Sequence, residues 1–267
     1  MVNHAKFSRF LTVLAILLIA TPVFAATHLG FKHLGSDDGL SSSYVKVIAQ
    51  DSNGFIWLGT KNGLDRYDGI SLRTFQCRDD KASRGNNNIG AIYEDNDGHL
   101  WVGTDRGVFV FDPHTEIFTV LDKASPNGVK AEDWVQTIQG DREGNIWILI
   151  PNQGVFKYRN DKIEYYSVTS HNGDKEKLPL SLHVARSGNV YVGTNRQGLF
   201  FYDRQTNMFR KLGSNNETFR KLDEVMLQYL VELPDGSLGL STREGELLRV
   251  NTATLNVSPL RFSRSGS

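Results

Sequence analysis

The sequence is poor in cysteine and has no excess of charge of either sign. Cys77 is the only cysteine among 267 residues, so no internal disulfide can form and a hydrophobic core must hold the fold. Cys77 ends a stretch of alternating apolar residues, which predicts a strand position rather than a nucleophile. Lysine plus arginine and aspartate plus glutamate both total 30. Without a basic field to hold phosphates, nucleic-acid binding is not expected.

Long apolar runs are also lacking, with one exception near the N-terminus. Phe10 to Ala20 is an apolar run of 11 residues, preceded by Lys6 and Arg9 and followed by the small-residue sequence Val23-Phe24-Ala25. This layout predicts a secretory signal peptide over residues 1–25, with cleavage after Ala25. The run is shorter than the roughly 20 residues that a spanning helix needs. We therefore expect a periplasmic chain, with an uncleaved N-terminal anchor as the alternative.

Motifs of catalysis, nucleotide binding and metal binding are missing as well. The sequence has no G-x-S-x-G elbow, no G-x-x-x-x-G-K-[ST] loop and no H-E-x-x-H motif. Its seven histidines are scattered, and none pairs with another at metal-ligand spacing. The segment Asp95 to Gly98 resembles the start of a calcium loop, but Arg106 stands where that loop has its glutamate, so a hairpin turn is favoured. No catalytic residue, metal site or cofactor is predicted.

What the sequence does contain is an internal repeat. Five segments share a tight-turn glycine followed by apolar residues and a second glycine, and their first glycines are 44, 46, 44 and 48 residues apart. A period in the mid-forties with strand-like alternation is typical of β-propeller blades. We therefore predict an all-β propeller of four-stranded antiparallel blades over residues 26–267. The repeats are centred on Gly54, Gly98, Gly144, Gly188 and Gly236.

The first repeat illustrates the expected blade. Its strands are predicted at residues 44–50, 55–60, 64–67 and 71–77, with glycines in the turns, where positive φ is needed. Two positions recur in register, and the aromatic one is expected to pack between blades. Three residues after the first glycine stand Trp57, Trp101, Trp147, Tyr191 and then Gly239. Six residues before it stand Ile48, Ile92, Ile138, Leu182 and Leu230.

Residues Asp38 to Gly69 resemble the two-component regulator propeller repeat of bacterial sensor proteins. The pattern D-x-x-G-x-[IL]-W-[VIL]-G-T-x-x-G-[LV]-x-x-[YF]-D is nearly complete at residues 51–68 and 95–112, and it fades afterwards. Repeat three lacks the Gly-Thr pair, and repeat five lacks the tryptophan and the final aspartate. The resemblance implies a periplasmic input domain. In the family, such domains precede an immunoglobulin-like domain, a membrane helix and a histidine kinase or diguanylate cyclase, none of which this sequence contains.

The ring is expected to be incomplete. Phe31 to Leu34 could supply a spare outer strand, yet the fifth repeat has its own at residues 255–262, which leaves one strand too many for five blades. We therefore expect a chain that forms part of a larger ring, with a closed five-bladed ring as the alternative. An unclosed ring leaves a bare sheet edge and an uncovered blade face.

Polar residues in the turns suggest a ligand-binding rim. The loops between the second and third strands and the residues entering the first strand should surround the channel on one face. Their amides, arginines and aromatic rings suit a small polar ligand such as an oligosaccharide, although turns are polar in any soluble propeller. The candidate ligand-binding residues are Tyr44, Asn62, Asn88, Arg106, Trp134, Gln153, Arg196 and Arg243.

Three functions fit this pattern. The first is a non-catalytic, ligand-sensing input module of a signal-transduction protein anchored in the inner membrane, with a homodimer formed through the longer parent protein as one arrangement. The second is a propeller enzyme of the lyase or quinoprotein type, which would need a cluster of histidine, glutamate and arginine or a set of metal ligands in the channel. The third is a scaffold propeller that binds another protein, which a large exposed apolar patch would favour.

Overall fold

A computed structural model of the chain describes residues 31–81, 84–168 and 179–261. The chain divides into two compact units, Met1–His33 and Leu34–Ser267, and every described strand lies in the second. None of the described helices is long and apolar enough to cross a membrane. The predicted signal peptide at residues 1–25 lies outside the described residues. Residues 31–34, considered as a spare outer strand, are not part of any strand.

The second unit contains five four-stranded antiparallel sheets, in each of which the strands are ordered as in the sequence. Blade 1 consists of β1 (Val45–Gln50), β2 (Ile56–Thr60), β3 (Leu64–Tyr67) and β4 (Leu72–Phe75). Blade 2 consists of β7 (Ile89–Glu94), β8 (Leu100–Thr104), β9 (Gly107–Asp112) and β10 (Ile117–Val120). Blade 3 consists of β11 (Thr137–Gly140), β12 (Ile146–Ile150), β13 (Gly154–Arg159) and β14 (Lys162–Tyr166). Blade 4 consists of β15 (Pro179–Val184), β16 (Val190–Thr194), β17 (Leu199–Asp203) and β18 (Met208–Lys211). Blade 5 consists of β19 (Leu227–Glu232), β20 (Leu238–Thr242), β21 (Leu247–Asn251) and β22 (Asn256–Pro259).

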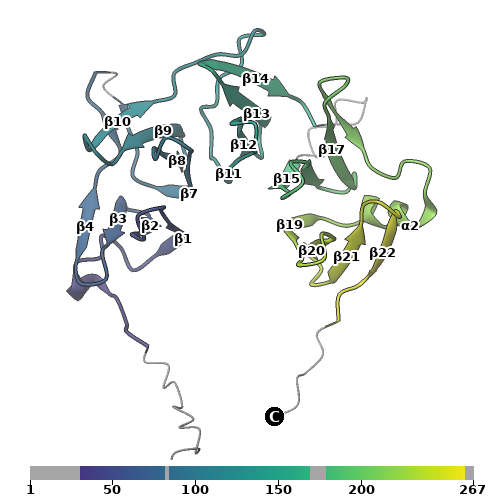
Figure 1. Cartoon of the computed structure of the whole chain (residues 1–267), viewed down its shortest axis with the longest axis horizontal. Helices are drawn as coiled ribbons and strands as arrows, with labels where there is room; N and C mark the ends of the chain where they lie inside the picture. Colours follow the sequence, from purple (N-terminus) through teal and green to yellow (C-terminus); the bar gives the residue numbers. More distant parts are fainter. Residues whose placement is uncertain (1–30, 82–83, 169–178, 262–267) are drawn as a thin grey trace, which may run out of the picture. The chain divides into compact units, whose positions relative to one another are not determined.

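Within this unit, consecutive blades follow one another along an arc, with their first strands toward a common centre (Figure 1). The first strands of neighbouring blades contact one another, from β1 and β7 through β11 and β15 to β19. The sheets are not closed into a ring, and blades 1 and 5 stand at the two ends of the arc in Figure 1. The predicted propeller of four-stranded blades in an incomplete ring is therefore confirmed.

An aspartate in the first turn of a blade fixes the tryptophan of the same blade. In blade 3, Asp141 Oδ1 accepts hydrogen bonds from the backbone N–H groups of Glu143 and Asn145, both at 3.0 Å, and Oδ2 accepts one from the Trp147 indole at 2.9 Å. Burial alone would raise the pKa of Asp141, but these hydrogen bonds outweigh it and lower the pKa. Blades 1 and 2 repeat the arrangement with Asp51 and Trp57 and with Asp95 and Trp101. The D-x-x-G-x-[IL]-W part of the motif is thus a hydrogen-bonded unit that orients the aromatic ring.

A threonine at the end of the second strand closes the next turn. Thr104 Oγ1 donates to the Gly107 carbonyl oxygen at 2.9 Å and accepts from the Arg106 N–H at 3.2 Å. Blades 1 and 4 use Thr60 and Thr194 in the same way. Blade 3 has Ile150 at this position, and its carbonyl oxygen accepts from the Gln153 N–H at 2.9 Å. A backbone hydrogen bond therefore closes the turn where the threonine is missing.

The glycine before that threonine lies where neighbouring blades approach closely. A Cβ atom at Gly103 would lie 2.5 Å from Val135 Cγ1, in the segment that enters blade 3. A Cβ at Gly59 would lie 2.7 Å from Ile89 Cγ2, and one at Gly193 would lie 2.8 Å from Leu227 Cβ. The Gly-Thr pair of the motif therefore has two separate roles, one in packing against the next blade and one in the turn.

Four hydrophobic clusters lie at the junctions between consecutive blades. Trp57 and Trp147 are 0% exposed, Trp101 is 4% exposed and Tyr191 is 6% exposed. Each of these rings belongs to a cluster that contains residues of its own blade and of the following blade. The sequence prediction that these aromatic residues fill the space between blades is confirmed.

The two ends of the arc expose apolar side chains that other blades bury. Ile48 is 67% exposed, while the equivalent Ile138 is 4% exposed. Ile138 packs against blade 2, whereas no described blade precedes blade 1. At the other end, Leu247 is 44% exposed, and the equivalent Leu199 in blade 4 is fully buried. Burial at these positions depends on the neighbouring blade and not on the residue type.

Two short insertions add structure that the repeat pattern does not predict. Strands β5 (Arg78–Asp79) and β6 (Arg84–Gly85) form a two-stranded ribbon after blade 1. Helix α2 (Glu217–Arg220) precedes blade 5, where its Phe219 packs in the cluster between blades 4 and 5. Strand β4 ends two residues before Cys77, which is buried, and burial raises the pKa of its thiol. The thiol is therefore kept in its unreactive protonated form.

Candidate ligand-binding site

The first strands of all five blades contribute to one concave groove of about 710 Å³, called the inner groove here. It is formed mainly by the beginnings of β1, β11, β15 and β19 and by the residues just before them, which Figure 1 shows facing the centre of the arc. A volume in this range is typical of sites for small molecules. The lining residues used below are Tyr44, Lys46, Trp134, Gln136, Gln139, Ser181, Gln228 and Tyr229.

Three aromatic rings of the inner groove are accessible. Tyr44 is 56% exposed, Trp134 is 41% exposed and Tyr229 is 68% exposed. They come from three different blades or blade entries, so their rings stand on separate walls of the groove. Exposed rings of this kind provide flat apolar faces against which a sugar ring or another ring can stack.

The polar lining of the inner groove consists mostly of neutral groups. Gln136 Oε1 is buried and has no hydrogen-bond partner among the described residues. The Gln139 side chain is already engaged, because its Oε1 accepts from the Val184 N–H at 2.7 Å. The Lys46 ammonium donates to Asn88 Oδ1 at 2.6 Å. Amide and hydroxyl groups therefore dominate the hydrogen-bonding capacity that the described lining offers.

A smaller hollow of about 280 Å³ adjoins the inner groove. The two share Trp134, Gln136, Gln228 and Tyr229. Arg243 and Met226 complete the hollow on the side of blade 5, where the Arg243 N–H donates to the Met226 carbonyl oxygen at 3.1 Å. Arg243 is exposed, so its guanidinium could pair with a carboxylate or hydroxyl of a bound molecule.

The structure brings three of the eight candidate residues to this site. Tyr44 and Trp134 line the inner groove, and Arg243 lines the adjoining hollow. The remaining five, which do not line either space, are Asn62, Asn88, Arg106, Gln153 and Arg196.

Three of these five residues make local hydrogen bonds in the turns around the arc. The Asn62 amide donates to the Ser41 carbonyl oxygen, and the Asn88 amide donates to Asp105 Oδ2, both at 3.1 Å. Arg196 has positive φ, and its N–H donates to the Val225 carbonyl oxygen at 3.2 Å. The first two contacts link a turn to the segment that enters the first strand of the same blade, and the third links blade 4 to the segment that enters blade 5.

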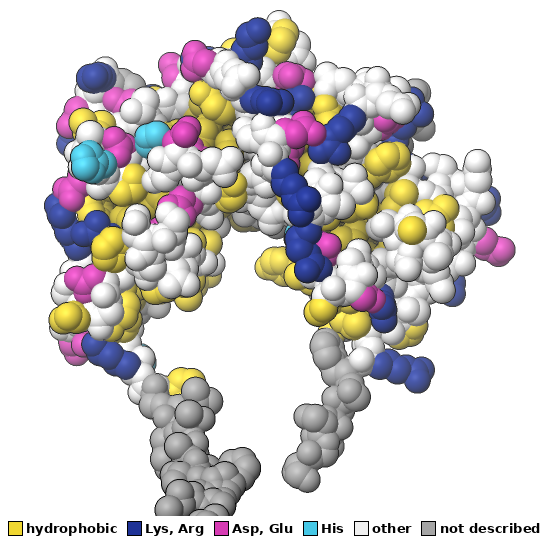
Figure 2. Space-filling view, in the orientation of Figure 1, with side chains coloured by type: hydrophobic (Ala, Val, Ile, Leu, Met, Phe, Trp, Pro, Cys, Tyr) yellow, Lys and Arg dark blue, Asp and Glu magenta, His cyan; other side chains and the backbone are white. Residues whose placement is uncertain are grey.

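The sequence reasoning did not find the glutamines of the first strands. The candidates came from the loops between the second and third strands and from the single residue that enters each first strand. Gln136, Gln139 and Gln228 lie further along, on or immediately before the first strands of blades 3 and 5. A polar residue in an otherwise apolar first strand is a usable signal, because successive side chains of a strand point to opposite faces. Surface charge does not mark a binding site, since acidic and basic side chains are interspersed over the face seen in Figure 2.

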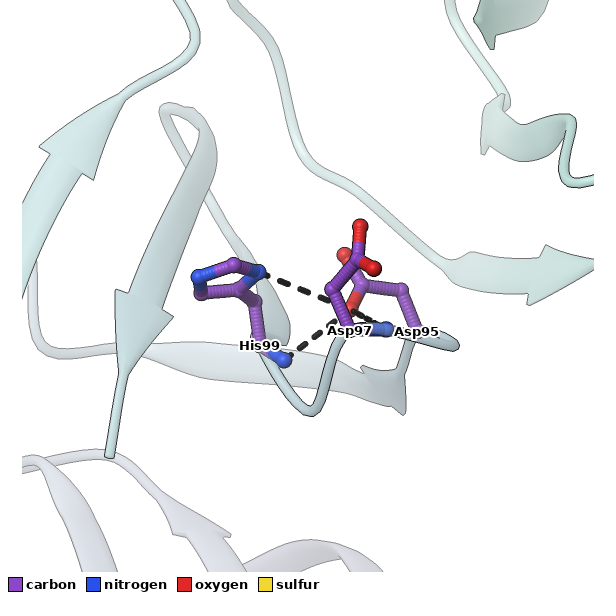
Figure 3. A group of neighbouring side chains, drawn as sticks. All are labelled: Asp95, Asp97 and His99. Atoms are coloured by element: carbon purple, nitrogen blue, oxygen red, sulfur yellow. Dashed lines mark hydrogen bonds and ion pairs between the residues drawn. The ribbon is translucent and has the colours of Figure 1, made fainter. Parts of the chain in front are cut away.

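Asp95, Asp97 and His99 form a group whose ligand atoms lie within 4.8 Å of one another (Figure 3). Asp95 already accepts hydrogen bonds from the N–H groups of Asp97 and His99 and from the Trp101 indole. Its carboxylate is therefore committed to the first turn of blade 2, as Asp51 and Asp141 are in blades 1 and 3. The hairpin turn predicted for this segment is present, and its geometry accounts for the grouping without an ion.

Comparison with known proteins supports the sequence prediction. The family model of the two-component regulator propeller matches residues 39–62 and 83–106. No match was found among curated proteins.

Solved propellers share the fold. The extracellular domain of BT3049 from B. thetaiotaomicron, proposed to be a hybrid two-component system, is 21% identical with a TM-score of 0.67 over 85% of this chain and 31% of that chain. The extracellular domain of BT4673 from the same organism, proposed to be a one-component system, is 21% identical, with a TM-score of 0.67 over 83% of this chain and 30% of that chain. PorZ, an essential surface component of the type-IX secretion system of Porphyromonas gingivalis, is 17% identical, with a TM-score of 0.60 over 83% of this chain and 34% of that chain.

The chain spans about a third of the length of these structures. At such low identities the likeness shows a common fold, while the family match lies within the first two repeats of this chain. The chain therefore has the blades of a β-propeller, and residues 39–62 and 83–106 match the repeat of the two-component regulator propeller family.

Proposed function

We propose that this chain is the exported ligand-sensing input segment of a bacterial signal-transduction protein and that it has no catalytic role of its own. The family of its first two repeats supports a regulatory role, and the extracellular domains with a similar fold support export. In this proposal the output is a membrane-bound kinase or cyclase of the parent protein, and nucleic acid is not a partner.

The observation that carries the proposal is the inner groove, to which the first strands of all five blades contribute. Its accessible rings and neutral amides suit a polar, hydroxyl-rich molecule, so we assign an oligosaccharide as the ligand class. A ligand that touches several first strands would favour one arrangement of neighbouring blades over others. Differential affinity of that kind is what a binding signal requires.

Export is tested at the N-terminus. We expect the mature protein to begin at Ala26, within one or two residues, because small residues precede this position after the apolar run. Edman sequencing of the protein recovered from the periplasm of an expressing bacterium would measure this directly. Recovery of a soluble chain that still begins at Met1 from the cytoplasm would refute export.

Ligand binding is tested by calorimetry on a panel of neutral oligosaccharides and organic acids. We expect Trp134→Ala to weaken binding about tenfold or more, because a lost stacking contact of 1.5 kcal/mol is roughly that factor. Arg243→Ala should weaken the binding of ligands that carry a carboxylate more than the binding of neutral ones.

Arg106→Ala is the matched control for Arg243→Ala, because both arginines are exposed and lie at the same turn of their blades, but Arg106 does not line the site. It should bind like the unmodified chain. If Arg106→Ala lowers affinity and Trp134→Ala does not, the ligand is held by the outer turns and the inner groove is the wrong site.

A further inference from the structure

Each of blades 1 to 4 places one side chain directly across the sheet from its motif aromatic. This position lies on the third strand and pairs with the aromatic in the ladder between the second and third strands. The pairs are Trp57 with Arg66, Trp101 with Val110, Trp147 with Lys157 and Tyr191 with Phe201. The residue type at this position therefore differs between blades that are otherwise built alike.

In blades 1 and 3 the position holds a cation that lies over the motif tryptophan. The Arg66 guanidinium carbon is 5.8 Å from the centre of the Trp57 ring, and the Lys157 nitrogen is 5.8 Å from the centre of the Trp147 ring. Lys157 also lies 5.3 Å from the Tyr202 ring centre and 3.3 Å from a Glu164 oxygen. These distances are those of cation–π contacts. The chain thus supplies its own ammonium or guanidinium group at two of its blade junctions.

Blade 2 lacks this internal cation. Val110 stands at the position, and its side chain has no charge and is too short to reach across the ring of Trp101. A cavity of about 520 Å³ lies there, between blades 2 and 3, with Trp101, Val110 and Tyr158 in its walls. Tyr93, at the end of β7, forms another part of the wall. The cavity touches the end of this first strand, whereas the inner groove touches the beginnings of the first strands, so the two spaces are distinct.

The charges around the cavity would complement a positive ligand. Four carboxylates line it, against one lysine, Lys123, which is paired with one of the four. The Asp97 carboxylate is exposed, and only the backbone N–H of this residue is used in the turn. The four carboxylates belong to Asp95, Asp97, Asp141 and Asp161.

We propose that this cavity binds the primary ammonium group of a linear aliphatic amine, which takes the place over Trp101 that the Lys157 ammonium has over Trp147. Tyr93, Val110 and Tyr158 hold the methylene chain, and the small accessible part of the Trp101 ring, which is 4% exposed, attracts the charge. Asp97 accepts a hydrogen bond from the ammonium. Asp95, Asp97 and His99 alone would suit a small metal ion, but a metal ion would leave the aromatic cavity unfilled. The comparison with blades 1 and 3 favours an organic cation.

Calorimetric titration of the mature chain with putrescine and spermidine tests the proposal. We expect saturable binding of one molecule per chain. Val110→Lys should abolish it, because the new side chain reproduces the Lys157 arrangement and occupies the site from within. Asp97→Asn, which keeps the shape of an exposed side chain, should weaken binding about tenfold or more. Asp37→Asn, a change at another exposed carboxylate outside the cavity, is the control and should bind like the unmodified chain.

A second arm separates a free amine from a lysine side chain of a peptide. N-acetyl-lysine methylamide has the same terminal ammonium but a bulky backbone end, so equal affinity for it would assign the site to lysine side chains. Thermal denaturation of each variant shows whether it is folded. If Val110→Lys does not fold, Asp97→Asn still tests the proposal.

Three results would overturn the proposal. The first is no heat of binding with either amine at millimolar concentration. The second is binding that survives both Val110→Lys and Asp97→Asn. The third is tight binding of Ca²⁺ or Zn²⁺ that depends on Asp97 and is not displaced by putrescine, which would make the group a metal site instead.

Discussion

Trp147→Ala is expected to lower the free energy of unfolding by about 3–5 kcal/mol. The side chain is fully buried between blades 3 and 4, and its ring centre is 4.8 Å from that of Tyr202 and 6.0 Å from that of Phe209. Removing it leaves a cavity that the two sheets cannot close without moving their backbones. It also removes the indole N–H from Asp141 Oδ2, which then keeps only the hydrogen bond from the Asn145 side-chain amide at 2.7 Å.

Urea denaturation followed by circular dichroism would measure this loss. Trp134→Ala is the matched control, since it removes the same side chain from a position that is 41% exposed, and it should cost less than about 1 kcal/mol. If the two variants lose equal stability, the distinction between a buried junction tryptophan and an accessible groove tryptophan is mistaken.

Gly103→Ala is expected to destabilise the chain by about 1–3 kcal/mol, the usual cost of overpacking. The new methyl group would lie 2.5 Å from Val135 Cγ1 and 2.8 Å from Val135 Cβ. A rotamer change of Val135 moves only Cγ1 and Cγ2, so the backbones of the two blades must move apart. Alanine normally gains stability over glycine inside a strand because the unfolded chain loses freedom. A loss therefore reports the close approach of the blades.

The double variant Gly103→Ala with Val135→Ala identifies the cause. Val135→Ala alone should be destabilising, because this side chain is fully buried. If the two methyl groups compete for the same space, the double variant should be more stable than the sum of the single losses predicts. Strict additivity, measured by the same urea titrations, would mean that Gly103 is needed for some other reason.

The sequence predicts the blades well because their signals are local. The turns at Gly54, Gly63 and Gly69 are all present with positive φ, and the predicted third strand of blade 1, residues 64–67, matches β3. The side chains of the motif act within a few residues of one another, as Asp141 does with Trp147. Such contacts repeat wherever the motif repeats.

What the sequence does not predict depends on distant neighbours. Ile48 has the same residue type as Ile92 and Ile138, and only the lack of a described preceding blade leaves it exposed. The inner groove was not predicted for the same reason. Gln136 and Gln228 are far apart in the sequence, and only the arrangement of the blades brings them to one groove. The cavity beside Trp101 is recognised only from the pairing of Val110 with Trp101 in the ladder. An alignment of the repeats shows this position, whereas the amino-acid composition does not.

The central claim is that a polar ligand is held by the first strands of several blades. Hydrogen–deuterium exchange of the mature chain, measured with and without the tightest-binding oligosaccharide of the calorimetric panel, tests it most directly. We predict slower exchange in residues 134–139 and 226–230, the parts of blades 3 and 5 that line the inner groove. Slower exchange confined to the turns around Arg106 and Arg196, with β11 and β19 unchanged, would contradict the claim.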